Sequence, residues 1–130
     1  MAIIIKSLGD GILNSSDLTN IFTTATDGKT ALVRNIRFVN PSTQSPAWLT
    51  VAFVRTTGTP GQPGPARLLG PGPVYIEPKE MYALAEELAL EYGGTGSSAI
   101  SDAIQAKAVQ SDGVTAIPID YVISGIEREA

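Results

Sequence analysis

The 130-residue chain contains no cysteine and no histidine. Without cysteine it has no disulfide framework, no thiolate metal site and no cysteine nucleophile. Without histidine it lacks the usual imidazole metal ligand and the side chain that most often moves protons at neutral pH. These two absences argue against an enzyme, and we expect no catalytic residue, no cofactor and no metal site.

Charged residues are also scarce, at 17% of the chain, against about 25% in an ordinary soluble domain. Nine basic and thirteen acidic residues give a net charge of -4, whereas a nucleic-acid-binding domain normally carries a basic excess. Hydrophobic residues make up 43% of the chain, and a small domain with so few charges tends to leave apolar surface for a partner to cover. We therefore expect no nucleic-acid partner, and a homo-oligomer or a component of a larger assembly.

Long apolar runs are missing as well. None approaches the roughly 20 residues that span a bilayer, so we expect no membrane partner. The apolar start Ile3-Ile4-Ile5 ends at Lys6, and the segment has neither the charged region nor the long apolar region of a secretory signal peptide.

Turn-forming residues recur at short intervals between β-prone runs. This spacing is typical of an antiparallel β-sandwich or barrel, and the length fits one domain over residues 1–130. The turn signals are Gly9-Asp10-Gly11, Asp27-Gly28, Asn40-Pro41-Ser42, Gly93-Gly94 and Asp112-Gly113. The strands predicted most directly are Ile3–Leu8, Leu18–Thr23, Thr30–Asn40, Trp48–Arg55, Ala103–Val109 and Ile119–Ile126.

Two of these strands predict details of packing. Val33 and Ile36 both look like core residues although their parities differ, which predicts a bulge near Arg34–Asn35. The strand 48–55 is largely apolar on both faces, so we expect both faces to be covered.

The segment Lys79–Tyr92 is ambiguous. Its alanines, leucines and glutamates favour a helix, and Met81, Leu84 and Leu88 keep helical spacing. Apolar alternation over the same residues and the surrounding β-rich context favour a strand, a turn and a second strand.

A Pro/Gly-rich loop is predicted over residues 57–73. Its prolines lack ladder donors and its glycines cost backbone entropy, so we expect no sheet there. Such a loop is either a solvated excursion or a contact with a neighbouring subunit. The contact is favoured by Arg67, Leu68 and Leu69 in its second half.

An N-terminal strand or arm is predicted over residues 1–17. Ile3, Ile4 and Ile5 would give it an apolar edge that invites pairing with another chain. The candidate interface residues are therefore Ile3, Ile4, Ile5, Arg67, Leu68 and Leu69.

Charge order offers a second route to assembly. Residues 28–76 carry five basic and no acidic residues, while residues 77–130 carry three basic and ten acidic ones. If these segments formed different faces, copies would attract one another head to side. If their strands interleave in space, the charges mix and the attraction disappears.

Other groups of chemically active residues have simpler interpretations. Glu86-Glu87 with Glu91 is a solvated face rather than a glycosidase pair or a calcium site, since calcium loops need dense Asp/Asn/Gly spacing. The aromatic residues are more typical of core or rim positions than of a sugar-stacking platform. These aromatic residues are Trp48, Tyr75, Tyr82, Tyr92 and Tyr121.

The order of these pieces resembles that of small β-sandwich virion proteins of tailed bacteriophages, over roughly residues 18–127. The resemblance is carried by a Gly-Lys-Thr-Ala turn, a strand that ends in Asn, an aliphatic strand, a proline-containing approach and two closing strands. In this chain these are Asp27–Ala31, Val33–Asn40, Leu49–Val54, Ile76–Glu80, Asp102–Ala108 and Tyr121–Glu127.

The resemblance implies an all-β antiparallel sandwich, jelly-roll or immunoglobulin-like, with the Pro/Gly loop as an insertion. It also implies a non-enzymatic structural protein of the virion, made in the host cytoplasm without a signal peptide. A capsid decoration or cement protein that binds the major capsid protein is the first interpretation. A tail-tube or tail-surface protein, and a carbohydrate-binding attachment module, are the alternatives.

Overall fold

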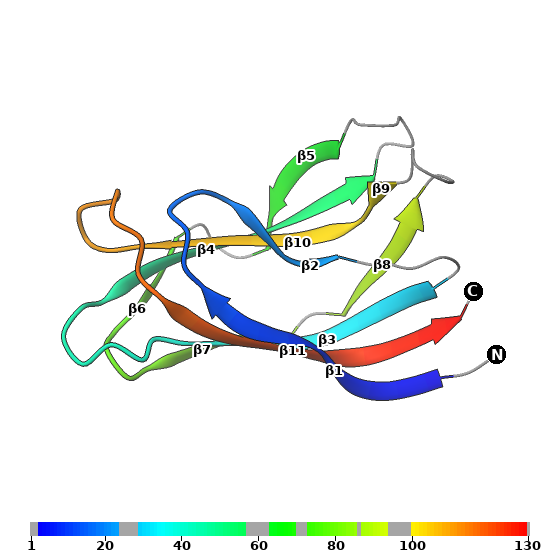
Figure 1. The fold of residues 1–130 in the computed structure, drawn as a ribbon, viewed down its shortest axis with the longest axis horizontal. Helices are drawn as coiled ribbons and strands as arrows, with labels where there is room; N and C mark the ends of the chain where they lie inside the picture. The colour runs from blue at the N-terminus through cyan, green and yellow to red at the C-terminus, as the bar shows by residue number, and fades with distance from the viewer. Residues whose placement is uncertain are drawn as a thin grey trace.

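A computed structural model describes residues 3–23, 29–56, 63–69, 73–85, 87–93 and 100–129. At residues 3–7, 29–30, 55–56, 63–65, 91–93, 100–101 and 127–129 it describes the backbone alone. All the regular structure in these ranges is β-strand, and the strands form two antiparallel sheets that face each other (Figure 1). The all-β antiparallel sandwich is therefore confirmed.

The sheets divide the strands as follows. Sheet A has the order β1 (Ile3–Leu13), β11 (Ile119–Glu129), β3 (Lys29–Val39), β8 (Leu88–Gly93) and β9 (Ile100–Ser101), and β7 (Met81–Leu84) also pairs with β3. Sheet B has the order β2 (Thr19–Thr23), β10 (Ala103–Val109), β4 (Ala47–Thr56) and β5 (Pro63–Leu68), and β6 (Val74–Ile76) also pairs with β4.

The chain is rolled up as one long hairpin. β1 pairs with β11, β2 with β10, β3 with both β7 and β8, and β4 with both β5 and β6. Ladders between β11 and β3 and between β10 and β4 then join these pairs into the two sheets. This connectivity is that of a jelly roll and not of an immunoglobulin domain.

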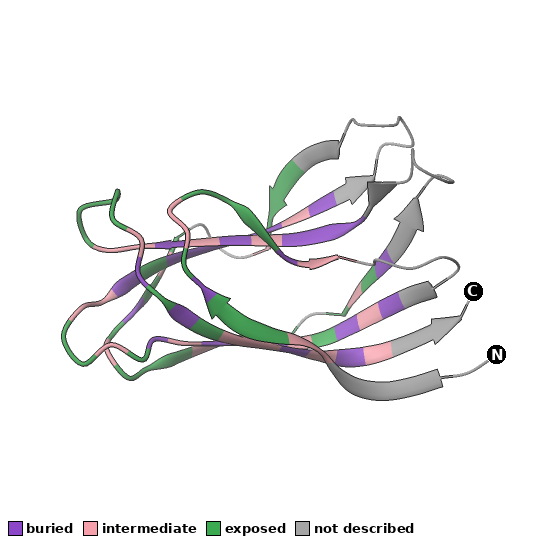
Figure 2. Cartoon of the chain, viewed as in Figure 1, coloured by how far each residue is buried: buried purple, intermediate pink, exposed green. Residues whose placement is uncertain are grey.

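The core lies between the sheets and takes alternate residues from each strand (Figure 2). β10 has the boundaries that the sequence predicted, and its Ile104, Ala106 and Ala108 are all fully buried. The largest fully buried apolar side chains are Phe38, Leu13, Ile36, Leu49, Leu90, Ile104, Ile119, Ile123 and Val33.

The bulge predicted in β3 is present. Ser124 of β11 pairs with Asn35, and the next residue, Gly125, pairs with Val33, so Arg34 is the extra residue. Val33 and Ile36 both face the core as a result. A Cβ on Gly125 would lie 2.1 Å from the Leu32 carbonyl oxygen, so only glycine fits at this bulged position of the β3–β11 ladder.

The ambiguous segment 79–92 forms strands, and its helical alternative is wrong. β7 and β8 both pair with β3. The last pair of β7 is Leu84 with Ile36, and the first pair of β8 is Leu88 with Val33. The break therefore lies opposite the β3 bulge. Helix propensity amounts to tenths of a kcal/mol per residue, and the β3 ladder and core burial override it.

Two sequence predictions about turns and loops are wrong. Gly9-Asp10-Gly11 is not a turn but lies inside β1, which has a register shift between Ser7 and Gly9. A Cβ on Gly11 would lie only 3.1 Å from the Tyr121 hydroxyl oxygen, so this glycine makes room for a packed ring.

Residues 63–68 of the predicted loop form β5 and pair with β4. β5 is an edge strand of sheet B, and an edge strand tolerates proline because one side of its ladder needs no donor. The predicted turns at 40–42 and 112–113 lie between strands as expected, with Gly113 at φ +75°. Asp27-Gly28 lies outside the described residues.

Candidate interaction surfaces

The first candidate surface is the edge that β1 forms on sheet A. Ile3–Ile5 lie in β1, whose eleven residues form the edge strand of that sheet and pair with β11 on one side. Among the described strands, none pairs with its other side. An open edge of this length is a template for pairing with another chain. Farther along β1, Ile12 exposes 68% of its surface on the outer side of the sheet.

The second candidate surface is the edge that β5 forms on sheet B. In β5, Arg67 and Leu68 are exposed, and Leu68 stands opposite Ala52 on the outer side of the sheet. Leu69 differs, because its side chain packs against the core and its N–H donates to the Val51 carbonyl at 2.9 Å. Only two of the three residues predicted here are therefore available to a partner.

The structure does not bring these two groups together. β1 contacts β2 and β10 across the core, while β4 contacts β9. β1 and β2 thus share one flank of the sandwich, and β5 lies on the opposite flank (Figure 1). The interface residues predicted from the sequence form two separate edges rather than one patch.

A third surface is the outer side of sheet B, which the sequence analysis did not identify as an interface. Trp48 and Tyr75 are exposed there at 37% and 46%, with ring centroids 5.0 Å apart and planes at 62°. They stand opposite each other in the β4–β6 ladder. Thr50, Ala52 and Val54 follow along β4 as a strip of small, buried side chains. The apolar outward face of 48–55 was the signal available in the sequence.

The exposed aromatic pair does not form a single flat stacking surface. The planes of Trp48 and Tyr75 are too steeply inclined to form one flat surface. Tyr82 and Tyr121 pack against the core, and the Tyr121 hydroxyl donates to the Ile21 carbonyl at 3.5 Å. The Tyr92 side chain lies outside the described residues.

A fourth surface is a groove of about 460 Å³ on the outer side of sheet A. It crosses β11, β3 and β7, and its floor is made of small side chains, with Met81 exposed at 60%. The groove is lined by Asn35, Arg37, Met81, Ala83, Val122 and Ser124.

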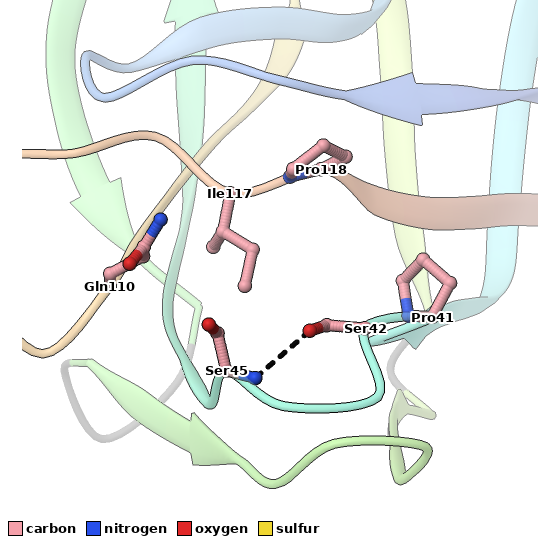
Figure 3. Close-up of a pocket in the computed structure, with 6 residues that line it drawn as sticks. All are labelled: Pro41, Ser42, Ser45, Gln110, Ile117 and Pro118. Atoms are coloured by element: carbon pink, nitrogen blue, oxygen red, sulfur yellow. Dashed lines mark hydrogen bonds between the residues drawn. The ribbon is translucent and has the colours of Figure 1, made fainter.

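The end of the sandwich holds a smaller pocket of about 330 Å³ between the β3–β4 and β10–β11 loops (Figure 3). The Ser45 N–H donates to the Ser42 hydroxyl at 2.9 Å, and Ile117 points toward this bond (Figure 3). The lining residues are Pro41, Ser42, Ser45, Gln110, Ile117 and Pro118. None of these side chains ionises near neutral pH, so the pocket offers no general acid or base.

Asn40 fixes the loops at this end. It is fully buried, and its amide nitrogen donates to the carbonyls of Ser45 and Ile76 at 2.9 and 3.2 Å. Its side-chain oxygen accepts the Ser42 N–H at 3.1 Å. One side chain therefore ties the β3–β4 loop to β6, which explains the asparagine at the strand end.

Among the acidic side chains that the structure describes, none converge on a reactive centre. Glu87 is exposed, and Glu86 and the Glu91 side chain lie outside the described residues. Glu77 raises the pKa of Glu80 by a hydrogen bond and by charge repulsion. Hydrogen bonds from Thr115 and Val114 lower the pKa of Asp112 to about 2. Within the described ranges, no three carboxylates lie close enough to hold a metal ion.

The segments of opposite charge interleave in space. β3, which is basic, lies between β11 and β8 of the acidic segment, and β10 lies beside β4. Of the two alternatives left open by charge order, interleaving is the one observed: the basic and the acidic segment do not form separate faces, and both signs of charge occur together in sheet A. In the part of the chain that the structure covers, no helix is long and apolar enough to cross a membrane.

No protein-family model matches the chain, and no curated protein sequence matches it. Two solved structures are similar in fold, one of the Gt strain and one of the Gx strain of infectious bursal disease virus. The TM-scores are 0.50 and 0.51, at 8% and 10% sequence identity. Each match covers 97% of this chain and 32% of the other chain, so this chain spans about a third of the length of the proteins that it resembles.

Proposed function

We propose that the chain is a non-enzymatic structural protein of a virus particle and, more narrowly, a decoration protein on the capsid of a tailed bacteriophage. The observation that carries this proposal is the pair of open strand edges, β1 and β5, on opposite flanks of one small sandwich. A unit with two such edges can pair with a neighbour on each side, and hence bridge subunits of a shell.

The fold similarity supports the viral part of this proposal. Jelly rolls occur in viral capsid domains and in lectins alike, so the fold by itself leaves a sugar-binding role open. The inclined Trp48–Tyr75 pair argues against that role. The missing histidine and cysteine argue against catalysis.

The first test is the location of the chain in particles of the phage that encodes it. Immunogold labelling of intact particles should place the chain over the heads, and quantitative mass spectrometry should give a fixed ratio to the major capsid protein. Label confined to tails would replace decoration by a tail role. Absence from purified particles would overturn the virion proposal itself.

The second test concerns the edge residues. Arg67→Glu reverses an exposed charge on β5 and should lower occupancy on particles at least several-fold. Val114→Glu is the control, because Val114 is 73% exposed in the β10–β11 loop and belongs to neither edge strand. If both variants fill particles as fully as the parent, the β5 edge makes no contact with the capsid.

A further inference from the structure

The outer sides of the two sheets differ in chemistry. The strands of sheet B contain three basic residues and no acidic residue, and one of the three, Lys107, lies on β10 next to the exposed aromatic pair. Lys107 stands opposite Thr50, which makes it a diagonal neighbour of Trp48. The outer surface formed by Lys107, Trp48, Tyr75 and Leu68 is called face B below.

The outer side of sheet A presents carboxylates on β1 and β11, the strands nearest the flank that β1 shares with β2. Asp120 of β11 stands opposite Ile12, and Asp10 of β1 stands opposite Val122, so the two exposed carboxylates are diagonal neighbours on the outer side. Across the same sheet, Asp120 is in line with Val39 and Met81. The outer surface formed by Asp10, Asp120, Arg37, Met81 and the groove beside them is called face A below.

The two faces match strand by strand. Because β1 and β2 share a flank, β11, β3 and β7 of sheet A follow the same order as β10, β4 and β6 of sheet B. From that flank, face A presents Asp120, then Arg37, then Met81. Face B presents Lys107, then Trp48, then Tyr75.

We propose that face B of one copy stacks on face A of the next, with Lys107 against Asp120 and the Trp48–Tyr75 pair over the 460 Å³ groove. A copy displaced along the sandwich normal lays β10, β4 and β6 over β11, β3 and β7 in the same order, and the long side chains of Lys107 and Arg37 span the two-residue offset of each from its partner along the strands. Arg37 then lies against the Trp48 ring as a cation–π partner, and Met81 against the Tyr75 ring as a sulfur–aromatic one. Among the described residues, neither Lys107 nor Asp120 has an ion-pair partner within the molecule.

A stack of this kind is head to tail. Each copy uses two different faces, so the contact does not close on itself and generates a linear array rather than a two-fold dimer. The inference rests on the proposed function for its biological meaning, since it names a second copy as one partner of the virion protein. The contact itself belongs to the purified chain and is measured apart from particle occupancy.

Sedimentation velocity of the purified chain tests the stack, with Lys107→Glu and Asp120→Lys as the informative variants. The parent should form species larger than the 13.6-kDa chain whose mass keeps rising with concentration. Each variant alone should need about tenfold more protein or more to associate, with an unchanged melting temperature. Trp48→Ala should weaken association as well, whereas Val114→Ala should leave it unchanged.

Mixing the two charge variants gives the decisive result. In an equimolar mixture, the glutamate introduced by Lys107→Glu meets the lysine introduced by Asp120→Lys. The unaltered Lys107 meets the unaltered Asp120, so every contact in an alternating array is attractive, and association should return to the parental level. A parent that stays monomeric, growth that stops at a dimer, or a mixture that remains dissociated would each overturn the stack. A monomeric parent that still fills particles would leave the proposed function intact.

Discussion

Sheets A and B enclose the same core but present different surfaces to solvent. The strands of sheet A carry five acidic and five basic residues, and those of sheet B carry three basic residues and no acid. On the flank that they share, sheet A ends in the eleven-residue edge strand β1, whereas sheet B ends in the five-residue strand β2. The inner faces must fit each other, which constrains both sheets alike. The outer faces are not constrained by this fit and can differ in charge and shape. Residues that recognise partners are therefore expected on the outer faces.

The largest effect expected from a single substitution lies inside sheet A. Gly125→Ala would place a Cβ 2.1 Å from the Leu32 carbonyl oxygen, where the obstacle is backbone and has little freedom to move. We expect a loss of about 3 kcal/mol or more in the free energy of unfolding, measured by urea denaturation. The control is Gly9→Ala, whose Cβ would meet its nearest neighbour, Phe22, at an ordinary 3.7 Å. Equal losses in the two variants would contradict the steric explanation of the glycine at position 125 in the β3–β11 ladder.

Adjacent residues of β4 separate the inner and outer faces of sheet B. Leu49 is fully buried in the core, so Leu49→Ala should cost about 3 kcal/mol of stability. Trp48 is 37% exposed on the outer face, so Trp48→Ala should cost about 1 kcal/mol while weakening self-association. Thermal and urea unfolding give the first quantity and sedimentation the second. A large loss of stability in Trp48→Ala would mean that the outer face of sheet B stabilises the folded chain rather than binding a second copy.

Asn40 lies where the loops at one end of the sandwich are fixed. Asn40→Ala removes three hydrogen bonds and leaves buried carbonyls without a donor, which should cost about 2 kcal/mol. Asn20→Ala is the control, because its one contact, an accepted bond from Gln105, is exposed. That change should cost about 0.5 kcal/mol or less. Similar losses in both would show that the Asn40 network adds little.

The sequence predicted those features of the fold that depend on which side chains are buried. Alternation located β10 to the residue, and the parity conflict of Val33 and Ile36 located the β3 bulge. Both signals arise from burial, because every second side chain of a strand faces the core and is apolar. The turn predicted at Gly9–Gly11 was wrong, because the space that Gly11 leaves for the Tyr121 ring is a tertiary requirement with no local pattern.

The candidate surfaces were harder to predict. The sequence indicated apolar residues in the segments that form β1 and β5. It did not predict that residues 63–68 pair with β4 or that Leu69 packs against the core. Prolines favour a loop unless the segment is already known to lie at a sheet edge, which the sequence does not show. The approach of Trp48 to Tyr75 joins residues 27 positions apart and depends on β6 pairing with β4. Charge order along the chain was misleading for the same reason, because pairing between distant strands decides which charges become neighbours.

The smallest expected effect concerns the β10–β11 loop that joins sheet B to sheet A. The pKa of Asp112 is about 2 in the folded protein, below its ordinary 3.8, because Thr115 and Val114 donate to its carboxylate. A lowered acid pKa adds stability that is present above about pH 4 and is lost as the pH falls toward 2. Asp112→Asn should therefore melt slightly below the parent at pH 6 and together with it at pH 2. A constant difference between these pH values would exclude the ionic contribution.

The central claim is that the open edges and outer faces of this sandwich are contact surfaces within a particle. Electron cryomicroscopy of intact particles tests it most directly, by locating the jelly roll in the density and identifying what lies against each surface. We expect ordered copies at regular positions on the capsid, with the β1 or β5 edge against a capsid subunit and with face B against face A of a neighbouring copy. Particles that contain the chain with both edges and both outer faces open to solvent would contradict the claim.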